Sequence, residues 1–153
     1  MQTSDTRSLT FLDDVEIPKG ISFLIVEDQA EISELIKDNL IDLGFEGAIT
    51  ESDSAEHALE LCKRSIEEKG ILKPFDFIIS DWNLKGLSGL DLLIEIKKIS
   101  TYQQVPFLMI TANDNVSGML VATKKGASEY LVKPWEEDEL ATKIALSWDK
   151  QNY

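Results

Sequence analysis

The chain is poor in the residues that support disulfide bonds, histidine chemistry and nucleic-acid binding. It has one cysteine, Cys62, which excludes a disulfide within the chain, and one histidine, His57. Only 15 Lys and Arg stand against 28 Asp and Glu, and the net charge is −13 at pH 7. Nucleic acids and anionic membranes both select for basic clusters, so the balance argues against either as a direct partner. No apolar run reaches the ~18 residues of a membrane span. These absences predict a cytoplasmic location.

Apolar segments of strand and helix length alternate along the 153 residues, which suffice for one domain. Short apolar runs predict buried strands, and apolar residues at three- and four-residue spacing predict helices. The predicted strands are 22–26, 45–50, 75–80, 105–110 and 129–132, and the predicted helices are 30–43, 54–68, 88–99, 113–125 and 136–148. This alternation predicts an α/β fold with a parallel sheet that helices cover on both faces.

Residues 1–20 are predicted to be an N-terminal extension, separate from a domain over residues 21–150. Acidic residues, a proline and a glycine disfavour a long helix in the extension. Its apolar residues either dock on the domain or belong to a loose tail, and both possibilities stay open. The residues concerned are Phe11, Leu12, Val15 and Ile17.

Polar and charged side chains follow or end four of the predicted strands. Glu27 and Asp28 follow the first, Asp81 the third, Thr111 the fourth and Lys133 the fifth. The carboxyl ends of parallel strands meet at one edge of the sheet, where open α/β sheets bind ligands. Gathered carboxylates repel one another and favour a divalent cation, and oxygen ligands select Mg²⁺. Lysine and threonine suit a phosphoryl group, which a carboxylate such as Asp81 can accept as a nucleophile.

Each of these residues alone has a simpler interpretation. Asp81 is also a typical turn residue, Glu27-Asp28 suits a helix cap, and Lys133 suits an exposed loop. Four strand ends that all carry residues suited to one phosphoryl site are harder to explain as caps and turns. The combination therefore favours a functional site.

Taken jointly, the motifs resemble the receiver domains of two-component response regulators, in particular the CheY-like type of chemotaxis. The resemblance runs from about Ile21 to Trp148. It rests on Glu27-Asp28, Ser80-Asp81-Trp82-Asn83, Thr111-Ala112, Lys124 to Tyr130, and Lys133-Pro134. It implies a flavodoxin-like (βα)5 three-layer sandwich whose five-stranded parallel sheet has the strand order 2-1-3-4-5.

The resemblance implies that Asp81 is the phosphoacceptor. Asp28, Asp81 and the backbone carbonyl of Asn83 are expected to bind Mg²⁺, and Glu27 is expected to act through metal-bound water. The cofactor is therefore expected to be Mg²⁺.

The resemblance also implies a phosphoryl contact and a switch. Lys133 is expected to bind the phosphoryl group, and Thr111 is expected to move toward it. Tyr130 is expected to change between an exposed and a buried rotamer. The Lys133-Pro134 peptide bond is expected to be cis.

Some positions depart from the pattern. The proline that often follows the acceptor is absent from the segment Leu84 to Gly89, so the sequence does not indicate what holds that loop. Trp135 stands where a phenylalanine is common, and the N-terminal extension lies outside the pattern. None of these differences removes a group needed for phosphorylation.

The expected function is that of a single-domain response regulator, because no output domain is visible. A histidine kinase or phosphotransfer protein would phosphorylate Asp81, and the chain would catalyse only its own phosphorylation and dephosphorylation. The target would be a protein that reads the face formed by the helix over 113–125, the strand over 129–132 and the last helix.

Several alternatives stay open. The chain could be a receiver fragment of a larger regulator or hybrid kinase, or a binding module that works without phosphorylation. A metal-dependent phosphohydrolase is disfavoured, because such enzymes usually carry a second acid close after the nucleophile, where this chain has Asn83.

Overall fold

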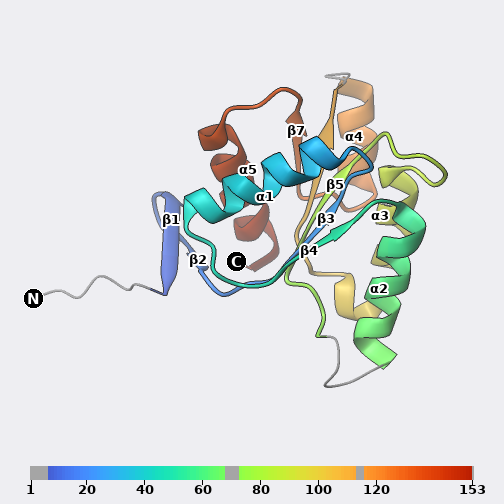
Figure 1. Cartoon of the computed structure of the whole chain (residues 1–153), viewed down its shortest axis with the longest axis horizontal. Helices are drawn as coiled ribbons and strands as arrows, with labels where there is room; N and C mark the ends of the chain where they lie inside the picture. The colour runs from blue at the N-terminus through green and yellow to red at the C-terminus, as the bar shows by residue number, and fades with distance from the viewer. Residues whose placement is uncertain (1–6, 68–72, 113–115, 153) are drawn as a thin grey trace, which may run out of the picture.

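The computed structural model describes residues 7–67, 73–112 and 116–152, and its centre is a five-stranded parallel sheet (Figure 1). The strands lie in the order β4-β3-β5-β6-β7, which confirms the expected flavodoxin-like order 2-1-3-4-5. Their bounds are β3 (Phe23–Val26), β4 (Ile49–Ser52), β5 (Phe77–Asp81), β6 (Phe107–Thr111) and β7 (Glu129–Val132). The strand order reverses between β3 and β5, and ligands of open α/β sheets bind at such a point.

Alternate residues of the central strands pack against opposite faces of the sheet. Phe23 and Ile25 join the core under α1 and α5, and Leu24 and Val26 join the core under α2, α3 and α4. Burial on both faces explains why these strands are continuous apolar runs. The helices are α1 (Ala30–Leu43), α2 (Ala55–Glu67), α3 (Gly89–Lys97), α4 (Val116–Lys124) and α5 (Glu137–Asn152), with a short 3₁₀ turn over Ser100–Tyr102.

Local signals set the ends of α1 and α3. Helix α1 has the predicted bounds and ends at Gly44, whose positive φ of 108° allows its N–H to reach the carbonyls of the last turn. At the start of α3, the Ser88 hydroxyl accepts the Asp91 N–H at 3.0 Å, and the Asp91 carboxylate accepts the Ser88 N–H at 3.0 Å. This reciprocal pair is a capping box.

The second strand of the chain's parallel sheet lies later than predicted. The prediction was 45–50, whereas β4 spans Ile49–Ser52. Phe45 instead stays attached to the end of α1, because its N–H donates to the Leu40 carbonyl at 3.1 Å. The predicted first residues of the fourth helix, 113–115, and the last residue of the second, Glu68, lie outside the described residues.

Residues 8–18 form an antiparallel hairpin that the sequence did not predict. Strands β1 (Ser8–Leu12) and β2 (Val15–Pro18) are joined by two residues, and Asp14 in the turn has a φ of 67°. Ile17 is fully buried, and the Phe11 ring lies 5.9 Å from that of Phe45. Figure 1 shows the hairpin beside α1 and α5, and both strands contact α5. Of the two possibilities left open, the docked arrangement is the one observed.

Candidate functional site

Three carboxylates meet at the carboxyl ends of β3 and β5. Glu27, Asp28 and Asp81 each offer an oxygen, and these atoms lie within 4.8 Å of one another. The two strands are neighbours, with Val26 in register with Ser80, so the residues that follow come together. Glu27 and Asp81 are buried, and Asp28 is half-buried. The structure thus assembles the acidic cluster that the strand ends predicted.

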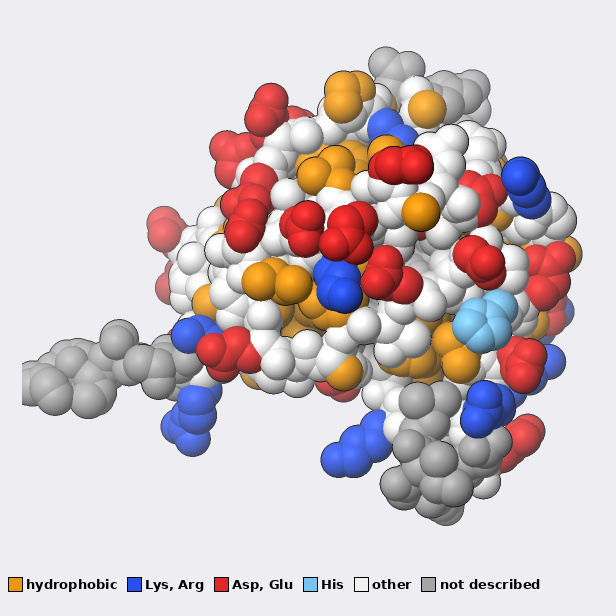
Figure 2. Space-filling view, viewed as in Figure 1, with side chains coloured by type: hydrophobic (Ala, Val, Ile, Leu, Met, Phe, Trp, Pro, Cys, Tyr) orange, Lys and Arg blue, Asp and Glu red, His pale blue; other side chains and the backbone are white. Residues whose placement is uncertain are grey.

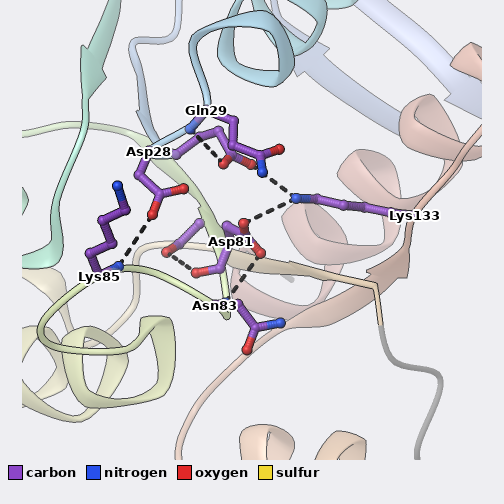
Figure 3. Close-up of polar contacts among 8 residues, drawn as sticks. Asp28, Gln29, Asp81, Asn83, Lys85 and Lys133 are labelled. Carbon is purple, nitrogen blue, oxygen red and sulfur yellow. Dashed lines mark hydrogen bonds and ion pairs between the residues drawn. The ribbon is translucent and has the colours of Figure 1, made fainter.

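Lys133 joins this cluster from the end of β7, as Figure 3 shows. Its ammonium lies 3.1 Å from Glu27 Oε1 and 3.0 Å from Asp81 Oδ2. Burial alone would lower the pKa of Lys133, but its hydrogen bonds and ion pairs with Asp81 and Glu27 outweigh burial and raise the pKa. The lysine is therefore firmly protonated beside the two acids. The Lys133-Pro134 bond is cis, as expected.

One lysine does not neutralise three acids. Burial raises the pKa of Glu27, and the charge of Asp81 raises it further against the opposing effects of the Gln29 N–H and Lys133. Such a group of hard oxygen donors with excess negative charge fits a divalent cation such as Mg²⁺.

Backbone N–H groups also bind the acids, and these contacts could not be predicted from the sequence. Gln29 donates to Glu27 at 3.0 Å, Asn83 to Asp81 at 3.2 Å and Lys85 to Asp28 at 3.2 Å. Figure 3 shows the Asn83 side chain pointing away from the carboxylates. The N-cap of α1 is Gln29, and it has no side-chain cap hydrogen bond. One oxygen of Glu27 accepts the N–H of this residue, and the other faces Lys133.

The loop after Asp81 is held without the missing proline. Asp28 accepts the Lys85 N–H, and the Glu56 carboxylate of α2 accepts the Leu87 N–H at 3.3 Å. The Gly89 N–H closes the loop by donating to the Trp82 carbonyl at 2.8 Å. Glu56, which the motifs did not single out, therefore helps to fix the loop that carries Asn83.

The predicted switch residues lie on β6, which is next to β5, and on β7, which is next to β6. Thr111 ends β6 and is buried, and Tyr130 lies in β7 and is partly buried. The Tyr130 ring packs edge-on against Trp82, with ring centroids 6.1 Å apart. Trp82 directly follows Asp81, so an aromatic contact links the acidic site to Tyr130.

The surroundings of the site are acidic as well. A hollow of about 510 Å³ adjoins Glu27 and Asp28 on the side of β4, and its other acidic lining residues are Glu34, Glu51 and Asp53. Figure 2 shows acidic side chains gathered over this face of the molecule, including the exposed surface of α1. The acidic residues around the three carboxylates therefore add to the attraction of a cation to this site.

The strand order and the acids at the switch point define a flavodoxin-like α/β domain with an acidic site at the carboxyl end of its sheet. The family described as the response regulator receiver domain matches residues 23–145, and the chain belongs to this family. Two-component signalling and a CheY-like fold follow from this membership. Receiver domains of this family bind Mg²⁺ in their acidic site and are phosphorylated by histidine kinases or phosphotransfer proteins.

Among curated relatives, chemotaxis protein CheY-3 of Vibrio cholerae is 33% identical over 126 residues, covering 82% of this chain and 90% of the relative. Chemotaxis protein CheY of Pseudomonas aeruginosa is 31% identical over 132 residues, covering 86% and 99%. The chain therefore spans nearly the whole length of these relatives.

Solved structures are similar as well. A putative response regulator from Chloroflexus aurantiacus has a TM-score of 0.72 at 26% identity, covering 85% of this chain and 98% of that one. The receiver domain of a sensor histidine kinase from Pseudomonas aeruginosa has a TM-score of 0.69 at 26% identity, covering 84% and 97%, and that structure holds a magnesium ion in its active-site cleft. Within the described residues, no helix of this chain has the length and apolarity that crossing a membrane requires.

Proposed function

We propose that the chain is a phosphorylation-controlled switch whose acceptor is Asp81. The observation that carries the proposal is the contact of the Lys133 ammonium with both Asp81 and Glu27 inside a cluster of three carboxylates. The donor is the phosphohistidine of a histidine kinase or phosphotransfer protein. The chain acts as a single-domain regulator in this proposal.

The residues present would hold Mg²⁺ through Asp28, Asp81 and the backbone carbonyl of Asn83, with Glu27 acting through water. When bound, the ion supplies positive charge that offsets the charge developing on the phosphoryl oxygens. The hydrogen bonds from Asn83 and Lys85 N–H groups to Asp81 and Asp28 hold these ligands in place before the ion arrives.

The transfer requires a nucleophile and a positive countercharge within reach of the phosphoryl oxygens. One carboxylate oxygen of Asp81 attacks the phosphorus, the phosphorus–nitrogen bond of the phosphohistidine breaks, and the departing imidazole keeps the electron pair. Lys133 moves from the Asp81 carboxylate to the transferred phosphoryl oxygens and neutralises part of their charge. Positioning and charge neutralisation supply most of the catalysis in such a transfer.

Phosphorylation would then change the face formed by α4, β7 and α5. The added charge draws the Thr111 hydroxyl toward Asp81, and Tyr130 occupies the vacated space. The exposed side chains of Leu120 and Val121 on α4 give this face apolar surface for a target protein. In this proposal the output of the chain is a changed protein-binding surface and not a released product.

Incubation with acetyl phosphate and Mg²⁺ tests the proposal. Intact-mass measurement should find one phosphoryl group that survives acid, is lost in base, and is absent from Asp81→Asn. A protein that gains no such group at Asp81 under these conditions would refute the proposal. Equal binding of a target by the wild type and Asp81→Asn would instead support a module that works without phosphorylation, and turnover of added phosphomonoesters would support a phosphohydrolase.

A further inference from the structure

Asn39 is a polar residue on the buried face of α1, and both the oxygen and the nitrogen of its side-chain amide form hydrogen bonds. Its Oδ1 accepts the indole N–H of Trp135 at 2.9 Å, and its Nδ2 donates to Glu137 Oε2 at 3.3 Å. The residue is 9% exposed. Burying an amide costs free energy unless it is hydrogen-bonded, so an apolar residue would serve packing alone at least as well. Packing alone therefore does not explain why an amide occupies this position.

Both partners of Asn39 lie shortly after β7, one on the connection to α5 and one at the start of that helix. Trp135 is two residues after Lys133, and Glu137 is the first residue of α5. Asn39 therefore ties the later part of this connection and the start of α5 to α1, and Figure 1 shows α1 lying alongside the start of α5. The Trp135 ring also packs against the core beneath these two helices. The segment cannot shift relative to α1 without breaking these contacts.

The same segment begins at Lys133, whose position decides its contact with Asp81. On the sheet side, the Lys133 backbone N–H donates to the Thr111 carbonyl at 2.7 Å. On the helix side, the bonds from Asn39 provide the second anchor. Glu27 and Asp28 lie just before α1, whose N-cap is Gln29. The Asn39 hydrogen bonds therefore connect the helix that follows the two acids with the segment that follows Lys133.

We propose that Asn39 is a positioning residue for phosphoryl transfer, which it serves by holding Trp135 and, through it, Lys133. The assignment rests on the function proposed above. Asn39 does not touch the reacting atoms. Its effect is to keep the ammonium where the phosphoryl oxygens arrive, because small displacements of a catalytic charge carry large kinetic costs.

Two variants test this role with beryllofluoride, a phosphoryl analogue, at saturating Mg²⁺. Asn39→Leu removes both hydrogen bonds at similar volume, and Trp135→Phe removes the indole N–H together with some ring volume but keeps an aromatic ring. Trp148→Phe is the matched control, because Trp148 packs against the same core from the far part of α5. Calorimetry measures the affinities for beryllofluoride and, separately, for Mg²⁺.

We expect Asn39→Leu and Trp135→Phe each to weaken beryllofluoride binding about 3- to 10-fold, with wild-type binding in Trp148→Phe. The Mg²⁺ affinity should not fall, because Lys133 is not a ligand. The double variant should bind no more weakly than Asn39→Leu, because both changes remove the same bond.

Wild-type beryllofluoride affinity in Trp135→Phe and Asn39→Leu would overturn the assignment. A loss of Mg²⁺ affinity in step with thermal stability would also overturn it, because that result marks a purely structural role. If the wild-type chain itself bound no beryllofluoride, the proposed function would fail, and the positioning role would fail with it.

Discussion

The backbone of Asp81 lies so close to Gly89 that a side chain at position 89 has no room. A Cβ added to Gly89 would lie 2.2 Å from the Asp81 carbonyl oxygen and 2.9 Å from the Trp82 Cα. Both are backbone atoms of β5 and the loop that follows it, so neither can rotate away. This glycine is required by close approach and not by its own backbone angles.

Gly89→Ala should therefore lower both stability and phosphorylation. We expect a loss of about 1–3 kcal/mol in the free energy of unfolding, measured by urea titration, because overpacking forces backbone shifts. The rate of phosphorylation by acetyl phosphate should fall as well, since the shift moves Asp81. Gly20→Ala is the control, because nothing lies within 4 Å of a Cβ there. Wild-type stability in Gly89→Ala would contradict the prediction.

At the level of single residues, the sequence predicted which side chains gather but not how the backbone holds them. Glu27, Asp28, Asp81 and Lys133 were predictable because each lies at or just after the carboxyl end of a strand of a parallel sheet. The N–H groups that bind the acids were not, since every residue except proline carries one. Asn39 was also missed, because a polar residue within a helix gives no sign of partners about a hundred positions away.

At the level of elements, the hairpin β1–β2 is the part of the fold that the sequence did not predict. Leu9, Phe11, Val15 and Ile17 alternate with polar residues, as strands do, but each run is short. The turn residues Asp13-Asp14 lack the glycine that marks most two-residue hairpins. Asp14 adopts a positive φ nonetheless, which aspartate tolerates better than most residues. The hairpin's burial then depends on distant partners such as Phe45.

Removing a buried hairpin side chain should destabilise the whole domain. Ile17→Ala should cost about 2–4 kcal/mol in the free energy of unfolding, because Ile17 is fully buried against the core beneath α1 and α5. Glu16→Ala changes the exposed neighbour on the same strand and should stay within about 0.5 kcal/mol of wild type. Equal stabilities for the two variants would mean that the hairpin is not coupled to the core.

Strand β7 and helix α5 are joined by ion pairs whose strength depends on pH. Glu129 accepts hydrogen bonds from Lys143 and Lys150. Burial alone would raise the pKa of Glu129, but the two lysines outweigh it and hold the pKa below its ordinary value of 4.5. A carboxyl whose pKa is lower in the folded state stabilises the fold above its ordinary pKa and stops doing so as the pH falls through the folded value.

Glu129→Gln should therefore lose stability relative to wild type at neutral pH and approach it in acid. Urea unfolding between pH 7 and about pH 3 measures the difference, which should shrink as the pH falls below 4.5. The stability of the variant is compared with that of wild type at each pH because many other carboxyls titrate in the same pH range. A difference that stayed constant with pH would show that the ion pairs contribute no net stability.

On the scale of the whole molecule, the charge of −13 affects how any cation acts on the protein. Acidic side chains cover α1 and line the hollow beside Glu27 and Asp28. Salt of any kind screens their repulsion, so a rise in melting temperature with added Mg²⁺ alone would not prove a site. Specific binding must be separated from screening by matched ionic strength and by a variant that lacks one ligand.

With ionic strength held constant by NaCl, Mg²⁺ should still raise the melting temperature. At ten times the dissociation constant, one site that exists only in the folded state adds about 1.4 kcal/mol, which is about 3–6 °C for a chain of this length. Asp28→Asn removes a proposed ligand, so its melting temperature should respond to Mg²⁺ no more than to NaCl. EDTA should return the wild type to its starting value. An equal Mg²⁺ response in Asp28→Asn would place the effect on the acidic surface and not at the strand ends.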